Sequence, residues 1–237
     1  MKLLAIDTST MRQSIAILDG SKVLCEINPN VDKTHSSNLI SNIKKLVEEH
    51  IGSFSSIDCL AFSQGPGSFT GLRIGATTMI SLAMINKLPL ISVSSTMAIA
   101  MNVKKNDVLV STLIDARMKQ VYFAQYEINK NETLPKELIE PKIIYADKLE
   151  QLFNKNSMIL GDGFIKYKEQ IEKIKGIHLE PGSSDYNFPK ASSVGLIAYE
   201  KFANNDFQIP NEANIHLFEP LYMRPSEAER NKENKGT

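Results

Sequence analysis

The sequence predicts an α/β protein made of two consecutive lobes with the same order of elements. Short runs rich in isoleucine, leucine and valine alternate with segments that repeat apolar residues every three or four positions, which is typical of strands mixed with amphipathic helices. The order strand, strand, strand, helix, strand, helix occurs twice, on either side of a polar segment at 103–108. With 237 residues, 42% of them hydrophobic, the chain is long enough to bury a core in each lobe.

The first lobe is expected over residues 1–103. It begins with three short strands, KLLAIDTS, QSIAILDG and KVLCEIN, and Asp19-Gly20 between the last two is typical of a hairpin turn. Two further strands, DCLAFS and LPLISVS, are interleaved with helices that the apolar spacing predicts near 36–50, 68–86 and 95–103. Ser36 or Ser37 is expected to cap the first of these helices.

The second lobe is expected over residues 104–224. DVLVSTLID and QVYFAQYEI predict a hairpin around ARMK, and ELIEPKIIYA a third strand. A helix DKLEQLFNK, a strand SMILGDG, a helix FIKYKEQIEKI and a last helix near 192–204 follow, and the polar tail at 225–237 is expected to be disordered. Three meandering strands followed by helix crossovers is the order of a ribonuclease H-like unit. Two such units in tandem are the architecture of the actin, sugar kinase and heat-shock ATPase fold.

Composition narrows the function classes. The formal net charge is zero, which argues against a chain that binds nucleic acid tightly by itself. The two cysteines are far apart, and none of the four histidines forms a pair at i, i+4, so no metal site is expected. No run is long and apolar enough for a membrane helix and no leader precedes the first strand, so we expect a cytoplasmic protein without membrane contact.

Two acidic residues suggest half of a nucleotide cleft. In the actin-like fold an acidic residue lies near the end of the first strand of each lobe, and Asp7 and Asp115 occupy those places here. Thr8 and Ser9 supply hydroxyls after Asp7, but the segment at 116–118 has no glycine, so its side chains would obstruct a phosphate. The alternative is that both carboxylates only bond the local backbone, and the cleft is then vestigial.

The segment QGPGSFTGLRIG at 64–75 resembles a phosphate loop without matching one. It lacks the lysine and the spacing of a P-loop, and it is one residue too long for a dinucleotide loop. Gly71 and Gly75 lie four residues apart on one helix face, which Thr78, Met79 and Leu82 continue. Each glycine weakens the helix by roughly 1 kcal/mol, so we expect another helix to approach this face, from the same chain or from another.

Seven segments together resemble the bacterial TsaB (YeaZ) family. They are, in order, LLAIDTST, THSSNLI, QGPGSFTGLRIG, VSSTMAIA, LIDARMKQVYFAQY, LGDG and PLYMRP. The resemblance implies a role in forming threonylcarbamoyladenosine at position 37 of tRNAs that read codons beginning with A. It implies a non-catalytic subunit that binds the catalytic paralogue TsaD and that is joined by a small ATPase, TsaE.

The resemblance also carries expectations about ligands and assembly. TsaD holds a metal through an H-x-x-x-H motif, which this chain lacks. ATP and the metal are therefore expected on the partner subunits, with no cofactor and no catalytic residue on this chain alone. Isolated members form homodimers, and tRNA is expected to bind through the complex. The competing hypothesis is a stand-alone ATP-binding enzyme that uses Asp7, Thr8, Ser9 and Asp115.

The family's partner surface uses the first helix and the helix after GPGSFTG. Transferred to this sequence, it predicts an interface formed by Leu39, Ile43, Leu46, Val47, Gly71, Gly75, Thr78, Met79 and Leu82. The alternative for the first four is that this apolar face packs wholly on its own sheet. Spacing alone leaves both open, because it identifies a buried face and not the surface that covers it.

Overall fold

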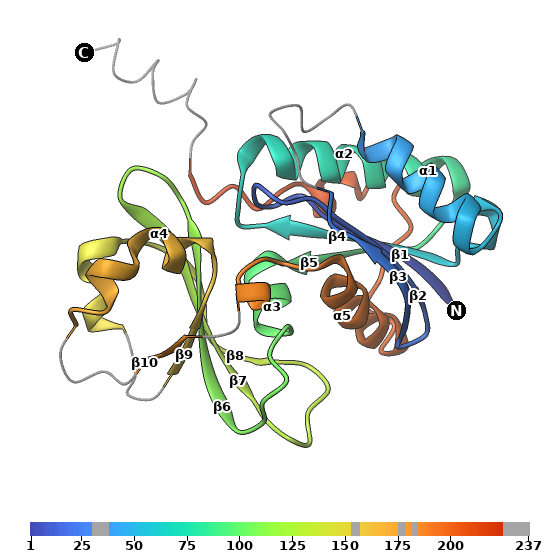
Figure 1. The fold of residues 1–237 in the computed structure, drawn as a ribbon. Helices are drawn as coiled ribbons and strands as arrows, with labels where there is room; N and C mark the ends of the chain where they lie inside the picture. The colour runs from blue at the N-terminus through green and yellow to red at the C-terminus, as the bar shows by residue number, and fades with distance from the viewer. Residues whose placement is uncertain (30–37, 153–156, 175–178, 182–183, 225–237) are drawn as a thin grey trace, which may run out of the picture.

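The computed structural model describes residues 1–29, 38–152, 157–174, 179–181 and 184–224 (Figure 1). The predicted cap residues Ser36 and Ser37 and the predicted disordered tail lie outside these residues. Within them, no helix is long and apolar enough to span a membrane.

The first sheet has the strand order β3-β2-β1-β4-β5. Its strands are β1 (Lys2–Asp7), β2 (Ser14–Asp19), β3 (Lys22–Ile27), β4 (Cys59–Gly65) and β5 (Leu90–Ser94). Strands β1, β2 and β3 form an antiparallel meander, whereas β4 and β5 run parallel to β1. The predicted Asp19-Gly20 turn joins β2 to β3, and Gly20 has the positive φ of 58° that such turns favour.

Both faces of this sheet are covered by helices because side chains on β1 alternate between them. Leu4 and Ile6 face a core beneath α1 (Leu39–His50) and α2 (Phe69–Asn86). Leu3 and Ala5 face a second core beneath α3 (Ser95–Ala100) and α5 (Ala191–Ala203). A sheet buried on both sides requires near-continuous apolar strands, and that pattern is what β1 and β4 show.

The second sheet repeats the same topology in the order β10-β9-β6-β7-β8. Its strands are β6 (Val108–Asp115), β7 (Gln120–Ile128), β8 (Lys136–Tyr145), β9 (Ser157–Leu160) and β10 (Leu179–Pro181). The predicted fold class of two ribonuclease H-like lobes is therefore confirmed. Helix α4 (Asp162–Ile171) packs on β6 and β9. The helix predicted at DKLEQLFNK begins instead with a 3-10 helix, η2 (Ala146–Gln151), and the end of the predicted segment lies outside the described residues.

The predicted position of the last helix is wrong. The sequence predicts this helix in a second lobe running to residue 224, but α5 lies on the first sheet, where Val194 and Ile197 join the core of Leu3 and Ala5 (Figure 1). Two short 3-10 turns, η3 (Ser184–Tyr186) and η4 (Ile215–Phe218), flank α5 along the chain. The reason is that the second face of the first sheet needs an apolar cover, and α5 is apolar enough to supply it.

The chain ends its described part with a segment that contacts both lobes. Residues 217–224, which we call the C-terminal strap, run beside the start of α2 toward the turn between β6 and β7 (Figure 1). On the first lobe, Gln64 Nε2 donates to the carbonyls of Leu217 and Glu219 at 3.0 and 2.7 Å. On the second lobe, the Arg224 guanidinium donates to the Ala116 carbonyl. The strap therefore ties the two lobes together at their facing tips.

Candidate functional site

The glycines of QGPGSFTGLRIG lie against the tip of β1. A Cβ atom added to Gly67 would lie 2.2 Å from the Ser9 carbonyl oxygen, and one added to Gly71 would lie 2.0 Å from the Thr8 carbonyl oxygen. At Gly75 the nearest atom would be Thr8 Oγ1, at 2.3 Å. The glycine face of α2 thus receives the chain's own strand tip. Our expectation that a helix approaches this face is wrong.

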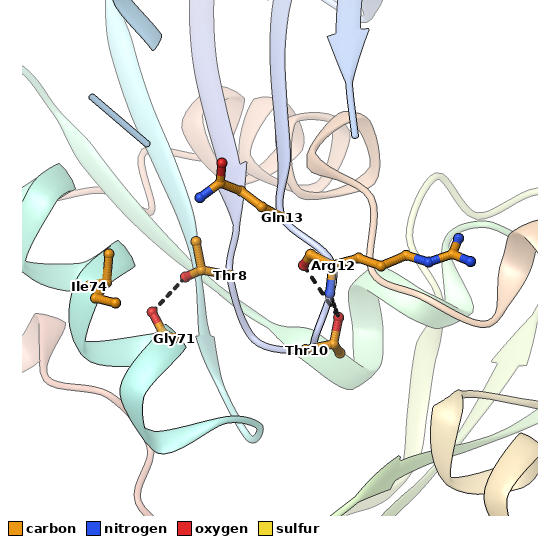
Figure 2. Close-up of a pocket in the computed structure, with 6 residues that line it drawn as sticks. All are labelled: Thr8, Thr10, Arg12, Gln13, Gly71 and Ile74. Atoms are coloured by element: carbon orange, nitrogen blue, oxygen red, sulfur yellow. Dashed lines mark hydrogen bonds between the residues drawn. The ribbon is translucent and has the colours of Figure 1, made fainter. Parts of the chain in front are cut away.

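Hydrogen bonds fix this contact. Ser68 N donates to the Ser9 carbonyl at 2.7 Å. Thr8 Oγ1 donates to the Gly71 carbonyl at 2.8 Å, as Figure 2 shows. The Ser9 amide and hydroxyl donate to Asp7, at 3.1 Å to Oδ1 and 2.9 Å to Oδ2 respectively. The hydroxyls predicted to face a phosphate are therefore engaged inside the lobe.

Asp7 is fully buried beneath this turn. Loss of solvent raises its pKa to about 6, although the hydrogen bonds from Ser9 oppose the rise and the nearby Asp162 carboxylate adds to it. Because the Asp7 carboxylate has a raised pKa and accepts hydrogen bonds from its own chain, it stabilises the strand tip as well as being a candidate to bind a ligand.

The tip of the second lobe carries a pair of acidic residues, Asp115 and Asp162. Asp162 Oδ1 accepts a hydrogen bond from the Asp115 amide at 2.9 Å, and burial raises the Asp162 pKa. Asp115 itself binds Lys166 Nζ at 2.7 Å. Asp162 lies in the LGDG segment and is not among the site residues that the sequence predicts. Its position directly after β9, at the same sheet edge as Asp115, was the available signal.

The turn after Asp115 has an unusual backbone. Arg117, Met118 and Lys119 all have positive φ angles, 64°, 49° and 60°, which side-chain-bearing residues rarely adopt in succession. The Asp115 carboxylate accepts from the Arg117 amide at 2.9 Å, and Arg224 binds the Ala116 carbonyl. The turn exposes three long side chains where an actin-like nucleotide cleft has glycine.

A small pocket lies between the tip of β1 and the start of α2 (Figure 2). Its space of about 10 Å³ is enough to hold about one water molecule. Its lining residues are Thr8, Thr10, Arg12, Gln13, Gly71 and Ile74. The pocket as described is far too small for a nucleotide.

The predicted interface residues of α1 are buried in their own lobe. Leu39, Ile43, Leu46 and Val47 are at most 3% exposed and pack in the core beneath α1 and α2. They offer no surface to a partner, which corrects our prediction for these four side chains. The outward side of α1 is charged, with Lys44–Glu48 and Lys45–Glu49 pairs at 3.8 Å.

Helix α2 differs from α1 on its outward side. Of the other predicted interface residues, Met79 is buried, whereas Thr78 and Leu82 are half-buried. Arg73 is the sole charged residue among its 18 residues. The side chains that α2 exposes to solvent are otherwise small or apolar, namely Thr70, Thr77, Ser81, Met84, Asn86 and Ile85, the last being 78% exposed.

Metal-ligating side chains do not gather in the described residues. No group of three or more histidine, cysteine, aspartate or glutamate side chains lies close enough there to hold an ion. Cys59 is buried, and burial raises the pKa of its thiol to about 12, so it is an unreactive core residue.

Comparison with known proteins gives a consistent family. A family model described as TsaD, tRNA N6-adenosine threonylcarbamoyltransferase, matches residues 27–232. The tRNA threonylcarbamoyladenosine biosynthesis protein TsaB of Bacillus subtilis is 32% identical over 97% of this chain and 96% of its own. The TsaB of Haemophilus influenzae is 33% identical over 94% of both chains. The solved structure of YeaZ from Pseudomonas aeruginosa superposes with a TM-score of 0.78 at 23% identity, covering 93% of this chain and 99% of its own.

Proposed function

Because the chain belongs to the TsaB family of tRNA threonylcarbamoyladenosine biosynthesis proteins, we propose that it acts in that pathway as a partner subunit. In this role it binds and supports the catalytic paralogue, TsaD, and does not transfer the threonylcarbamoyl group itself. The absence of an H-x-x-x-H motif from the sequence supports the division of labour that the resemblance implies. ATP and a metal ion then belong to the partner subunits, including the TsaE-like ATPase.

The observation that carries this proposal is the outward side of α2 after Arg73, which has no charged residue. A helix on the surface of a soluble protein ordinarily presents charged residues to water. Here Thr77, Ser81 and Ile85 form an exposed strip without charge along the helix. Depletion of charge is what distinguishes the core of protein–protein interfaces from the remaining surface.

The strip changes our prediction of which residues meet the partner. Gly71, Gly75 and Met79 hold α2 on its own lobe, and Thr78 and Leu82 lie at the margin of the exposed strip. The same strip serves a homodimer of the isolated chain, since a surface of this kind matches a second copy as well as a paralogue with the same fold.

Co-elution of the purified chain with its TsaD paralogue tests the proposal. Ile85→Asp places a charge on the strip and is expected to prevent co-elution while leaving thermal unfolding unchanged, because Ile85 makes little contact with its own core. The matched control is Ile165→Asp on α4, whose side chain is 51% exposed and lies in the other lobe. If both variants co-elute with the paralogue to the same extent, the proposal that α2 binds the partner is refuted.

The competing function, ATP binding by the chain alone, has less support. It requires free donors at the Thr8–Ser9 turn, and Thr8 and Ser9 direct their hydroxyls into internal bonds. It also requires backbone access after Asp115, where the exposed side chains of residues 117–119 stand. The partner function needs neither.

A further inference from the structure

Six cationic side chains surround the place where the lobe tips and the strap meet. Two come from the first lobe, three from the second and one from the strap: Arg12, Arg73, Arg117, Lys119, Lys166 and Arg224. We call them the cationic rim. The whole chain carries no net charge, so the rim is a local concentration of positive charge.

Contacts link the four arginines of the rim into one surface. Arg73 Nε donates to the Tyr222 hydroxyl at 3.1 Å, and two residues further along the strap Arg224 reaches the Ala116 carbonyl. Arg117 Nη2 lies 4.0 Å from Met11 Sδ, next to Arg12 in the sequence. The rim therefore crosses from α2 over the strap to the second lobe and back to the first.

Few carboxylates balance the rim. Asp115 binds Lys166 at 2.7 Å and lies 3.8 Å from Arg117, but its side chain is only 11% exposed. Asp162, whose carboxylate binds the Asp115 amide, and Asp7, which lies near Asp162, are the other carboxylates at the lobe tips, and Asp7 is fully buried. Arg117 and Lys166 remain 71% and 42% exposed, so their charges face solvent.

The geometry of the rim suits a phosphate-bearing polymer. Four of its members are arginines, whose planar forks bind phosphate in a bidentate manner. Two stack on aromatic rings, Arg12 at 3.9 Å from the Phe188 centroid and Arg73 at 4.4 Å from the Phe69 centroid, which holds the guanidinium groups in place. The strained turn at 117–119 points further cations outward, and backbone strain of this kind concentrates at ligand-binding sites.

We propose that the cationic rim contacts the phosphate backbone of the RNA substrate within the assembled complex. The choice of RNA over an acidic protein rests on the proposed function, because the relatives' names place them in tRNA modification. The zero net charge of the chain agrees with a contact that supplements a partner and is weak in the isolated subunit.

The test titrates tRNA into the full-length chain, alone and mixed with its TsaD paralogue, from about 0.05 to about 0.3 M salt. The rim variant combines Arg12→Gln with Arg117→Asn, because asparagine tolerates the left-handed backbone at 117. The control combines Lys136→Gln with Lys168→Gln, which removes the same charge from side chains that are 59% and 57% exposed and lie outside the rim. Thermal unfolding establishes that both variants fold.

Each lost phosphate contact is expected to lower the salt slope by about 0.7–0.9, so the rim variant loses about 1.4–1.8 and binds roughly 25- to 60-fold more weakly near 0.1 M salt. The control keeps the slope and affinity of the unaltered chain. Equal binding by both variants, or no tRNA binding at the lowest salt by chain or mixture, overturns the proposal. If the rim variant no longer co-elutes with the paralogue but binds tRNA as before, the rim contacts a protein and the proposal is also overturned. If the unaltered chain does not co-elute with the paralogue, the proposed partner function is refuted. The proposal about the rim is then decided by tRNA binding to the isolated chain.

Discussion

Replacing Gly75 with alanine measures how tightly α2 is fitted to the tip of β1. The new Cβ would lie 2.3 Å from Thr8 Oγ1, but 3.5 Å from Thr8 Cβ and 3.6 Å from Ile6 Cδ1, which are ordinary contact distances. Only the hydroxyl conflicts with the added methyl group. To make room, the Thr8 side chain must rotate, and its 2.8 Å hydrogen bond to the Gly71 carbonyl is then lost.

The size of the effect follows from two opposing terms. Loss of a buried hydrogen bond costs about 1–3 kcal/mol, and alanine in place of glycine inside a helix stabilises by about 1 kcal/mol. Gly75→Ala is therefore expected to lower the free energy of unfolding by up to about 2 kcal/mol. In a Thr8→Ala background the hydroxyl is absent, so the same change is expected to raise it by about 1 kcal/mol.

The coupling energy between Gly75 and Thr8 is measured by urea unfolding of four proteins: the isolated chain, the two single variants and the double variant. It is expected at about 1–3 kcal/mol. Gly71→Ala sets the upper end of the scale, because its Cβ would meet the Thr8 backbone carbonyl at 2.0 Å and no side-chain rotation relieves that clash. We expect it to cost more than about 3 kcal/mol. A coupling of zero would refute the internal role of Gly75. Loss of paralogue binding without loss of stability would instead place a partner on the glycine face.

Three further outcomes are expected. Ile43→Ala should lower the free energy of unfolding by about 2–5 kcal/mol in chemical denaturation, because Ile43 is buried. Ile40→Ala, at an exposed position of the same helix, should change it by less than about 0.5 kcal/mol. Equal effects of the two variants would contradict the burial of Ile43 in its own lobe. Folding raises the Asp7 pKa from 3.8 to about 6, so between about pH 4 and pH 6 the native state keeps a proton that the unfolded chain loses, and the free energy of unfolding should fall by up to about 3 kcal/mol as the pH rises. Urea midpoints measured across this range should show the decrease in the unaltered chain and not in Asp7→Asn. If Asp7→Asn keeps the same pH profile, Asp7 does not cause the decrease. Calorimetry of the isolated chain with magnesium and ATP should give no micromolar binding, since the Ser9 amide and hydroxyl already donate to Asp7, and a measurable heat of binding at that affinity would revive the competing function.

Most of the order of elements along the chain could be predicted because each lobe repeats one sequence of elements and local turns fix the meanders, but the short edge strand β10 was not predicted. Asp19-Gly20 determined the β2–β3 hairpin, and the apolar runs located β4 and β9 within a few residues. The location of α5 could not be predicted in this way. Its apolar face shows that it is buried, but periodicity does not tell which of two sheets has a face left uncovered.

The same limit explains the errors at the site. The spacing of Leu39, Ile43 and Leu46 predicted a buried face, and the structure shows that the chain's own sheet covers it. Gly71 and Gly75 predicted a close approach correctly, but the approaching group is the Thr8 turn, some 60 residues away in the sequence. What a small side chain makes room for depends on tertiary packing, which no local pattern records.

The internal use of the glycines has a consequence for the partner surface that we propose on α2. Its first turns rest directly on the backbone of Thr8 and Ser9, and Ser68 caps the helix while its amide bonds Ser9. Helix and strand tip therefore form one rigid unit, because interiors packed this closely do not deform continuously. The exposed strip around Ser81 and Ile85 is in turn held in a fixed position relative to β1 and, through the strap, to the second lobe. A partner bound to that strip is thereby oriented against the lobe tips, where the cationic rim lies, so the glycines stabilise the surface without being part of it.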